Sequence, residues 1–468
     1  MSLRQPCRAV LSGIPACRVV MLMMKIRFLA VFTLSLLIAL ACRVPGFAQD
    51  NEEEQERSVL TLLTDTFDGY IENATAVRLN KLDRFTKIKN SLRLSYENNF
   101  GDHVNLKLDG LGAYNAVYDV EDLDVDQEDS YRAYVDIREA TLNLFFDTFD
   151  LRLGKQQIIW EITDGLRVLD IINPLDLKEF ILNDFENLRI PLWMVNLTYY
   201  FSDDYSLQSL IIWDTSFTEF PHAGSEFAFS TPALPGGFQL LVNDDEELDV
   251  SAENTRYGLR FKGLLGNWDV TLNYLYTWNN IPVRKKALNL ETGTLSVSPE
   301  YERMQLIGGS IVNVLFDTVV RFELAGKLGL YFDVDDMTVP DMVVEKDTIE
   351  YALAFERDLW DITWILQGSQ QYILDYDQAI SSEKEVNTVA TLRASKALNY
   401  EETLEFEVLG MYRFADDGYL IRPKLTYDLT DALRLSAGLD IFGGGDKNGF
   451  FGQFDEKDQL YAELRYSF

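Results

Sequence analysis

The chain has 468 residues and a formal net charge of −33, with 42 Lys and Arg against 75 Asp and Glu. This acid excess argues against a nucleic-acid-binding surface, because contacts to phosphates need basic residues. It allows a membrane protein, provided that the charged side chains avoid the lipid.

The first 48 residues predict a secretory signal peptide. They contain six basic residues and no acidic residue. A basic start at Met24–Arg27 leads into the apolar run Phe28–Ala41, and Gly46-Phe47-Ala48 suits cleavage. The run is shorter than the ~20 residues that a membrane-spanning helix needs. We expect a signal peptide over residues 1–48, with Met24 as an alternative start.

The exported remainder lacks cysteine, because Cys7, Cys17 and Cys42 all precede the expected cleavage point. A disulfide framework is therefore excluded. Residues 49–69 are acidic and then apolar, and we expect them to form an N-terminal periplasmic segment. The remaining 70–468 are expected to form one domain.

Apolar and polar residues alternate along much of this domain. In Gln459–Phe468, Leu460, Ala462 and Leu464 share one face, and Glu463 and Arg465 share the other. Such a period of two predicts β-strands. The apolar faces are rich in Leu, Phe and Tyr, whereas the polar faces carry many charges. This contrast favours strands of a transmembrane barrel over those of a soluble sandwich.

The connections between the predicted strands alternate between short and long. Short turns include Asn99–Asp102 and Ser202–Asp204, and long polar segments include Asp119–Ser130 and Thr215–Ala252. Outer-membrane barrels have short periplasmic turns and long external loops, and they close because lipid offers no hydrogen-bond partner to a free edge. We predict an all-β transmembrane antiparallel barrel of about 18 strands starting near Tyr70, with 16 as the alternative.

The predicted inner faces carry both signs of charge, as in Lys424, Arg434 and Arg465 beside Glu405 and Glu463. A barrel of this size encloses a water-filled lumen, and such side chains suit a solute pore. Expected partners are outer-membrane lipid and lipopolysaccharide. The acidic loops are interpreted as solvated surface in preference to weak Ca²⁺ or Mg²⁺ sites. Oligomeric state and solute stay open.

Nothing in the sequence predicts catalysis. His103 lies at a short turn and His222 in a long loop, so a shared metal site is not expected. There is no glycine-rich phosphate loop. We expect a protein that is not an enzyme and has no cofactor, no metal site and no catalytic residue.

Arg132–Phe146 and Leu151–Trp160 are predicted to form a hairpin. Arg152 then lies opposite Asn143 and Gln156 opposite Glu139, all facing the lumen. Lys155 would share the lipid-facing side, which is costly, so we expect a bulge after Gly154 that turns it inward. The alternative is that Lys155 snorkels to a membrane interface.

The segment after Trp160 predicts a helix in an external loop. Asn173 is suited to the N-cap, Pro174 to the first turn, and Asp176 and Glu179 to the positive helix end. Five apolar residues recur at helical spacing: Leu177, Phe180, Ile181, Phe185 and Leu188. We expect an amphipathic helix over Asn173–Leu188 that folds back into the lumen and narrows it. An external lid is the alternative.

Three stretches of this region, RLGKQQIIW, DIINPLDLKEF and RIPLWMVNLTYYF, resemble a porin-like domain-of-unknown-function family of Gram-negative outer-membrane proteins. The resemblance covers about Ile137 to Phe201. Alginate-export channels and other substrate-specific porins are more distant look-alikes. The resemblance implies an outer-membrane channel and names no solute.

Together these observations predict a channel in the bacterial outer membrane for passive passage of a small solute. The alternatives are a channel for hydrophobic or polysaccharide cargo and a plugged structural or adhesive barrel. The residues expected to line the constriction are Glu139, Asn143, Arg152, Gln156, Asp176, Glu179, Asp184, Glu186, Arg321 and Arg434.

Overall fold

The computed structural model describes residues 66–230, 239–243 and 247–468. The expected signal peptide over 1–48 and the segment 49–65 lie outside the described residues. Among the helices that the structure does describe, none combines the length and the apolar character needed to span a membrane.

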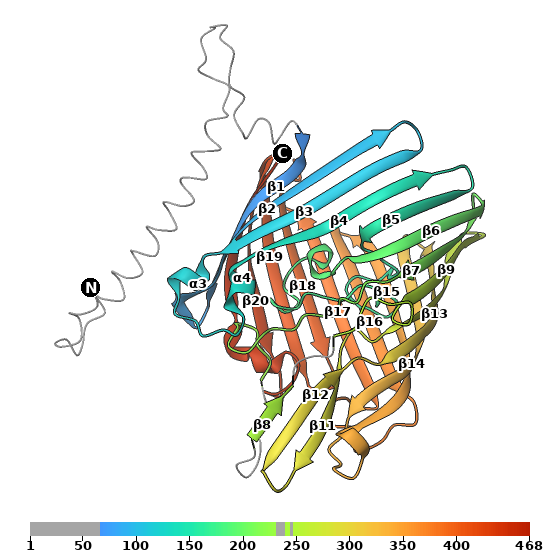
Figure 1. Cartoon of the computed structure of the whole chain (residues 1–468). Coiled ribbons are helices and arrows are strands. Elements are labelled where there is room, and N and C mark those ends of the chain that lie inside the picture. The colour runs from blue at the N-terminus through green and yellow to red at the C-terminus, as the bar shows by residue number, and fades with distance from the viewer. Residues whose placement is uncertain (1–65, 231–238, 244–246) are drawn as a thin grey trace, which may run out of the picture.

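Eighteen antiparallel strands form one sheet that closes on itself (Figure 1). Closure occurs between the first and last strands, where pairing runs from Tyr70 with Ser467 to Arg78 with Gln459. The prediction of a closed barrel of about 18 strands is therefore confirmed. The strands are β1 (Asp68–Arg78), β2 (Lys81–Phe100), β3 (Val104–Asn115), β4 (Ala133–Phe145), β5 (Phe149–Gln156), β6 (Leu192–Ser202), β7 (Tyr205–Ile212), β9 (Arg256–Leu265), β10 (Trp268–Trp278), β13 (Arg303–Leu315), β14 (Thr318–Asp333), β15 (Val343–Leu359), β16 (Ile362–Ile373), β17 (Val386–Ala397), β18 (Leu404–Arg413), β19 (Gly418–Thr430), β20 (Leu433–Gly443) and β21 (Gln459–Ser467).

Strand β15 shows why the sequence alternates. Tyr351, Leu353 and Phe355 are 37–40% exposed on the outer face of the barrel. Ala352 and Ala354, between them, are fully buried on the inner face. Successive side chains of a strand point to opposite faces, so an apolar outer face and a filled inner face require a period of two.

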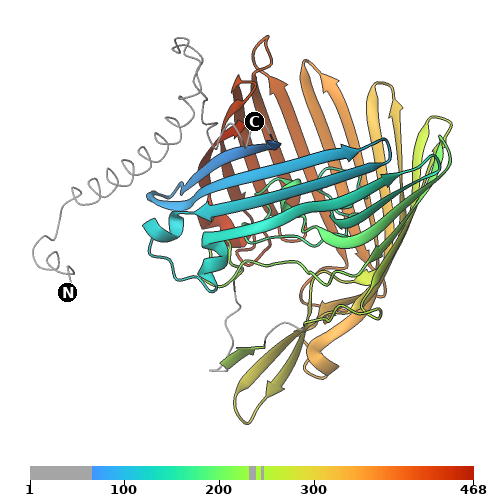
Figure 2. The same ribbon diagram turned by 45° about the horizontal axis from the view of Figure 1, so that its top comes forward.

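Short and long connections lie at opposite ends of the barrel, as Figure 2 shows. One end has two-residue turns such as 203–204 and 316–317, and the other has connections such as 116–132, 157–191 and 213–255. A small sheet of β8 (Gln239–Val242), β11 (Val283–Asn289) and β12 (Thr294–Glu300) projects from the long-loop end. The short helical elements are α3 (Val117–Val120), α4 (Glu128–Arg132), α5 (Phe185–Leu188), η2 (Pro340–Met342) and η3 (Gly452–Lys457).

The expected helix over Asn173–Leu188 is wrong in extent, because only α5 is helical. The Asn173 side chain does not cap a helix. It accepts a hydrogen bond from the backbone N–H of Ile158 (2.8 Å) and donates one to the carbonyl of Ile190 (2.8 Å). Leu175 forms an isolated β-bridge with Arg189, and Phe180 has a left-handed φ of 55°. Tertiary partners of the backbone have overridden the helical pattern.

The predicted hairpin of β4 and β5 has the expected register, with Arg152 opposite Asn143. The predicted bulge after Gly154 is wrong, since the register shows no shift there. The irregularity lies between β3 and β4, where Arg138 is an extra residue between Ile137 and Glu139. Lys155 instead lies 3.3 Å from the carboxylate of Asp136. A bulge thus forms on β4, in its pairing with β3, whereas the β4–β5 pairing is regular.

Candidate functional site

The connection between β5 and β6, residues 157–191, lies inside the barrel and is called the inserted loop (Figures 1 and 2). Its contacts reach strands that lie across the barrel from β5 and β6, the two strands that it connects. Asp164 exchanges two hydrogen bonds of 2.8 Å with Gln367 of β16. The carbonyl of Leu182 accepts a hydrogen bond of 2.9 Å from Arg422 of β19. The inserted loop therefore crosses the lumen from one wall to the other.

The first part of the inserted loop, residues 157–172, packs against an apolar patch of the inner wall. Trp160 and Leu169 are fully buried, and Ile172 is 1% exposed. Each such side chain contributes roughly 1.5–3 kcal/mol when it is removed from water. The wall residues of this cluster are Leu192, Met194, Leu210, Ile212, Leu275, Leu306, Ala325 and Ala352. We call this side of the lumen the apolar half.

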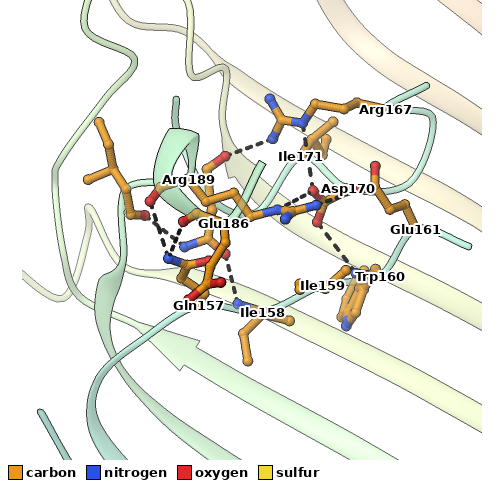
Figure 3. A network of polar contacts seen from close by, with 12 residues as sticks. Gln157, Ile158, Ile159, Trp160, Glu161, Arg167, Asp170, Ile171, Glu186 and Arg189 are labelled. Carbon is orange, nitrogen blue, oxygen red and sulfur yellow. Dashed lines mark hydrogen bonds and ion pairs between the residues drawn. The ribbon is translucent and has the colours of Figure 1, made fainter. Parts of the chain in front are cut away.

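Buried charges hold the same part of the loop in place (Figure 3). The guanidinium of Arg189, whose side chain is 4% exposed, lies 2.8 Å from Asp170 and 2.5 Å from Glu161. Burial, reinforced by the nearby Asp170, raises the pKa of Glu161 to about 8, although Arg189 opposes the shift. Breaking a buried pair leaves a charge without compensation, so this network specifies one loop conformation strongly.

Arg138 joins the wall to the end of the inserted loop. It donates hydrogen bonds to the carbonyl oxygens of Glu186 (2.7 Å) and Arg189 (2.6 Å), and it is 6% exposed. The β4 bulge places it inward. Sequence reasoning missed this residue, because the period of two does not reveal an inserted residue in a strand.

The second part of the inserted loop, residues 173–191, is held by an aromatic cluster and an ion-pair cluster. Phe180 is 1% exposed, with ring centroids 4.8 Å from Phe454 and 5.1 Å from Phe450. The carboxylate of Glu179 pairs with Lys87 and Lys89 of β2. Burial alone would raise the pKa of Glu179, but these two lysines hold it well below its usual range.

A row of polar cavities lies beside this second part of the loop. It consists of three cavities of about 50, 130 and 180 Å³. The outer cavity reaches Tyr118 and Tyr131 of the β3–β4 connection, and the inner one reaches Glu402 in the turn between β17 and β18. The outer and middle cavities share three lining residues, and the middle and inner cavities share five. The three cavities thus lie in a row between the long-loop end and the short-turn end.

Charged side chains, mainly of β1 and β18–β21, line the middle and inner cavities, and we call this side the charged half. The basic residues are Lys87, Arg422, Lys424, Arg434 and Arg465, and the acidic ones are Glu72, Asp184, Glu402, Glu405, Glu407, Asp428, Asp440 and Glu463. Ion pairs join Arg465 to Glu72 (2.6 Å), Arg422 to Asp440 (2.7 Å) and Lys424 to Glu463 (3.2 Å).

The structure brings some of the predicted constriction residues together and separates others. Asp184 and Arg434 line the inner cavity, and Asp176 and Glu179 line the outer one. Glu186 is 64% exposed and pairs with Arg93. Arg321 pairs with Glu356.

The other four predicted residues form a contiguous polar row on β4 and β5. Asn143 accepts a hydrogen bond of 2.8 Å from Arg152, and Arg152 also lies 3.7 Å from the carboxylate of Glu139. Gln156 is fully buried and accepts a hydrogen bond of 3.2 Å from Asn196. Their expected role in a constriction stays a prediction.

The two histidines lie at different ends of the barrel. His103, in the turn between β2 and β3, contacts the carbonyl oxygen of Phe145 (2.9 Å), and the ring of His222 packs on Tyr131 at the long-loop end. In the part of the chain that the structure describes, no three His, Cys, Asp or Glu side chains gather as metal ligands. Weak Ca²⁺ or Mg²⁺ binding by the acidic loops stays a prediction.

Comparisons with known proteins agree with this architecture. A family model described as "Protein of unknown function (DUF1302)" matches residues 70–468. No curated protein matches the sequence.

Two crystal structures are similar in fold. OccAB3 of Acinetobacter baumannii has a TM-score of 0.50 at 10% identity, covering 86% of this chain and 98% of that one. OccK2 (OpdF) of Pseudomonas aeruginosa, solved in complex with glucuronate, has a TM-score of 0.50 at 11% identity, covering 86% and 97%. At such identities the likeness is one of fold.

Proposed function

The chain belongs to the DUF1302 family of proteins of unknown function, and from its geometry we propose that it is a porin-like channel of the bacterial outer membrane. In this proposal, a small polar solute diffuses passively through the lumen. The inserted loop constricts the lumen, and the charged half forms the path that remains.

The connected row of three cavities carries the proposal. A barrel that served only as a scaffold would need no polar route from one end to the other, and a plugged one would block it. Here the cavities overlap through shared residues, including Asn183 and Asp184 of the inserted loop. Their walls are largely charged, which favours polar solutes over hydrophobic cargo. The glucuronate in OccK2 is an example of a small polar molecule held by a barrel of similar fold.

The outer face supports the proposed location. Large apolar side chains are exposed on successive outward positions, as in Ile349, Tyr351 and Leu353 of β15. Exposed contiguous apolar surface marks contact with lipid or with another apolar surface, and a closed barrel is one of the two backbone architectures that lipid tolerates. The signal peptide expected over residues 1–48 would direct export.

Planar lipid bilayers test the proposed channel. We expect insertion of the folded barrel to give a steady current that rises linearly with voltage, because the passage is open and wet. Insertion is verified independently by the heat-modifiable mobility of the barrel on gels. A folded, inserted barrel that carries no current would show that the lumen is plugged and would overturn the proposal.

Labelling of single cysteines tests the location and orientation. Cysteine at Asp124, in the long β3–β4 connection, should react with an impermeant maleimide on intact cells. Cysteine at Asp203, in the turn between β6 and β7, should react only after the outer membrane is opened. Labelling in the opposite order would reverse the proposed orientation.

A further inference from the structure

Two neighbouring residues of the inserted loop stand where the cavities meet. Asn183 lines both the outer and the middle cavity, and Asp184 lines both the middle and the inner cavity. The carbonyl of Asp184 accepts hydrogen bonds from the N–H groups of Asn187 (2.9 Å) and Leu188 (3.0 Å). The position of Asp184 in the passage is therefore fixed by the turn that starts α5.

Asp184 forms no ion pair within residues 66–230, 239–243 and 247–468, although Arg422 and Arg465 lie close enough for their charges to interact with it. Its carboxylate is exposed to the cavities. Each basic residue of the middle and inner cavities forms its ion pair with a carboxylate other than Asp184. Lys87 pairs with Glu179, Arg434 pairs with Asp428 (2.6 Å), and Arg422, Lys424 and Arg465 have the partners described above.

A carboxylate without an ion pair at a junction acts strongly on passing ions. Inside a narrow passage with protein walls, a fixed charge is screened less than on an open surface. The middle and inner cavities have eight acidic and five basic residues. Their net formal charge is therefore negative, like the charge of Asp184. Two further carboxylates of the inner cavity, Glu402 and Glu405, also lack an ion pair within the described residues.

Resting on the channel function proposed above, we propose that Asp184 is the selectivity residue of the passage and makes it favour small cations over anions. The favoured solutes are K⁺-like ions and small molecules that carry an ammonium or guanidinium group. The ion-paired side chains of the wall offer hydrogen bonds to any polar solute. Asp184 adds a preference for positively charged solutes at the point that every solute passes.

The test measures the reversal potential of single channels in planar bilayers under a KCl gradient. We expect the wild-type protein to pass K⁺ in preference to Cl⁻. Asp184→Asn should lower the K⁺/Cl⁻ permeability ratio by about twofold or more, and Asp184→Lys should lower it further.

Asp203→Asn is the matched control. Asp203 is an exposed carboxylate in the turn between β6 and β7, and it lines none of the three cavities of the described chain. Its substitution makes the same chemical change away from the cavities and should leave the permeability ratio unchanged.

The outcomes separate this inference from the proposed function. Folded channels that carry no current would overturn the channel itself. Wild-type channels that conduct but prefer Cl⁻, or a permeability ratio that Asp184→Asn leaves unchanged, would overturn the role of Asp184 alone. Asp184→Asn conserves the shape of the side chain, so the comparison holds even if Asp184→Lys fails to fold.

Discussion

The two halves of the lumen wall differ in how they contact the same inserted loop. In the apolar half, Trp160 and its neighbours exclude water and fix the loop by packing and a buried ion network. In the charged half, the loop leaves connected cavities and contacts the wall at separate points, including Phe180, Glu179 and the Leu182 carbonyl. One half therefore fixes the position of the loop, and the other half leaves room for a solute.

The largest expected effect comes from breaking the apolar half. Trp160→Ala removes a fully buried indole whose N–H donates to Gln208 (2.9 Å), and it should destabilise the packed loop by about 3–5 kcal/mol. We expect faster proteolysis of residues 157–172 in the folded barrel and a larger, fluctuating current. The matched control is Trp360→Ala, because Trp360 is 80% exposed in the turn between β15 and β16. Equal effects of the two variants would contradict the anchoring role of Trp160.

Phe180→Ala breaks the anchor on the charged side. Loss of this ring from the aromatic cluster should cost up to about 3–5 kcal/mol and should widen the passage, raising single-channel conductance while residues 157–172 stay protected from proteolysis. Phe180 has a φ of 55°, so Phe180→Gly should be about 1 kcal/mol less destabilising than Phe180→Ala. A Gly variant less stable than the Ala variant would show that this backbone strain is absent.

Arg138→Lys tests the connection between the wall and the loop. A lysine keeps the charge but lacks the planar fork that bonds two carbonyl groups at once, so about 1–3 kcal/mol of loop stability should be lost. The readout is more frequent flickering of the current at unchanged mean selectivity. Arg321→Lys is the control, since the partner of Arg321 is Glu356 on the wall. Flickering that is the same in both variants would argue against a specific role for Arg138.

The last prediction concerns pH. The pKa of Glu161 is raised from 4.5 to about 8 in the folded loop, so between these values the folded state holds a proton that an unfolded loop releases. Stability from this group is complete below pH 4.5 and is lost as pH rises through about 8. We expect hydrogen exchange in residues 157–172 to report lower stability at pH 9 than at pH 6, after correction for the intrinsic exchange rate. Glu161→Gln should remove this difference, and its persistence in that variant would assign it to another group.

Much of the barrel could be predicted because its constraint acts on every residue of a strand. Lipid outside and water or loop inside impose alternation on β15 and β21, and the lengths of the connections separate the two ends. The register of Arg152 and Asn143 followed from matching their faces. The bulge could not be located in this way, because Arg138 and Lys155 are both plausible inward-turning residues when only the pattern of one hairpin is considered.

The candidate site was predicted less well. Apolar residues at helical spacing over Asn173–Leu188 predicted one helix. Phe180, Leu182 and Leu188 are instead buried in a segment in which only α5 is helical and whose backbone also bonds to other segments. Of the four acidic residues expected to border the passage, Glu179 is neutralised by two lysines from β2, whereas Asp184 is left without an ion pair among the described residues. No local pattern distinguishes these two carboxylates.

The sequence by itself determined the class of architecture, since alternation, charge placement and connection length are local consequences of a barrel in a membrane. Only the tertiary structure decided which half of the lumen is filled and which carboxylate of the inserted loop is left without an ion pair among the described residues. The physical reason is range: strand faces are set by neighbours two residues away, whereas the partners of the inserted loop lie as far off as Gln367 and Arg422, 203 and 240 residues along the chain. Packing and ion pairing at such separations depend on how the closed barrel brings its walls together.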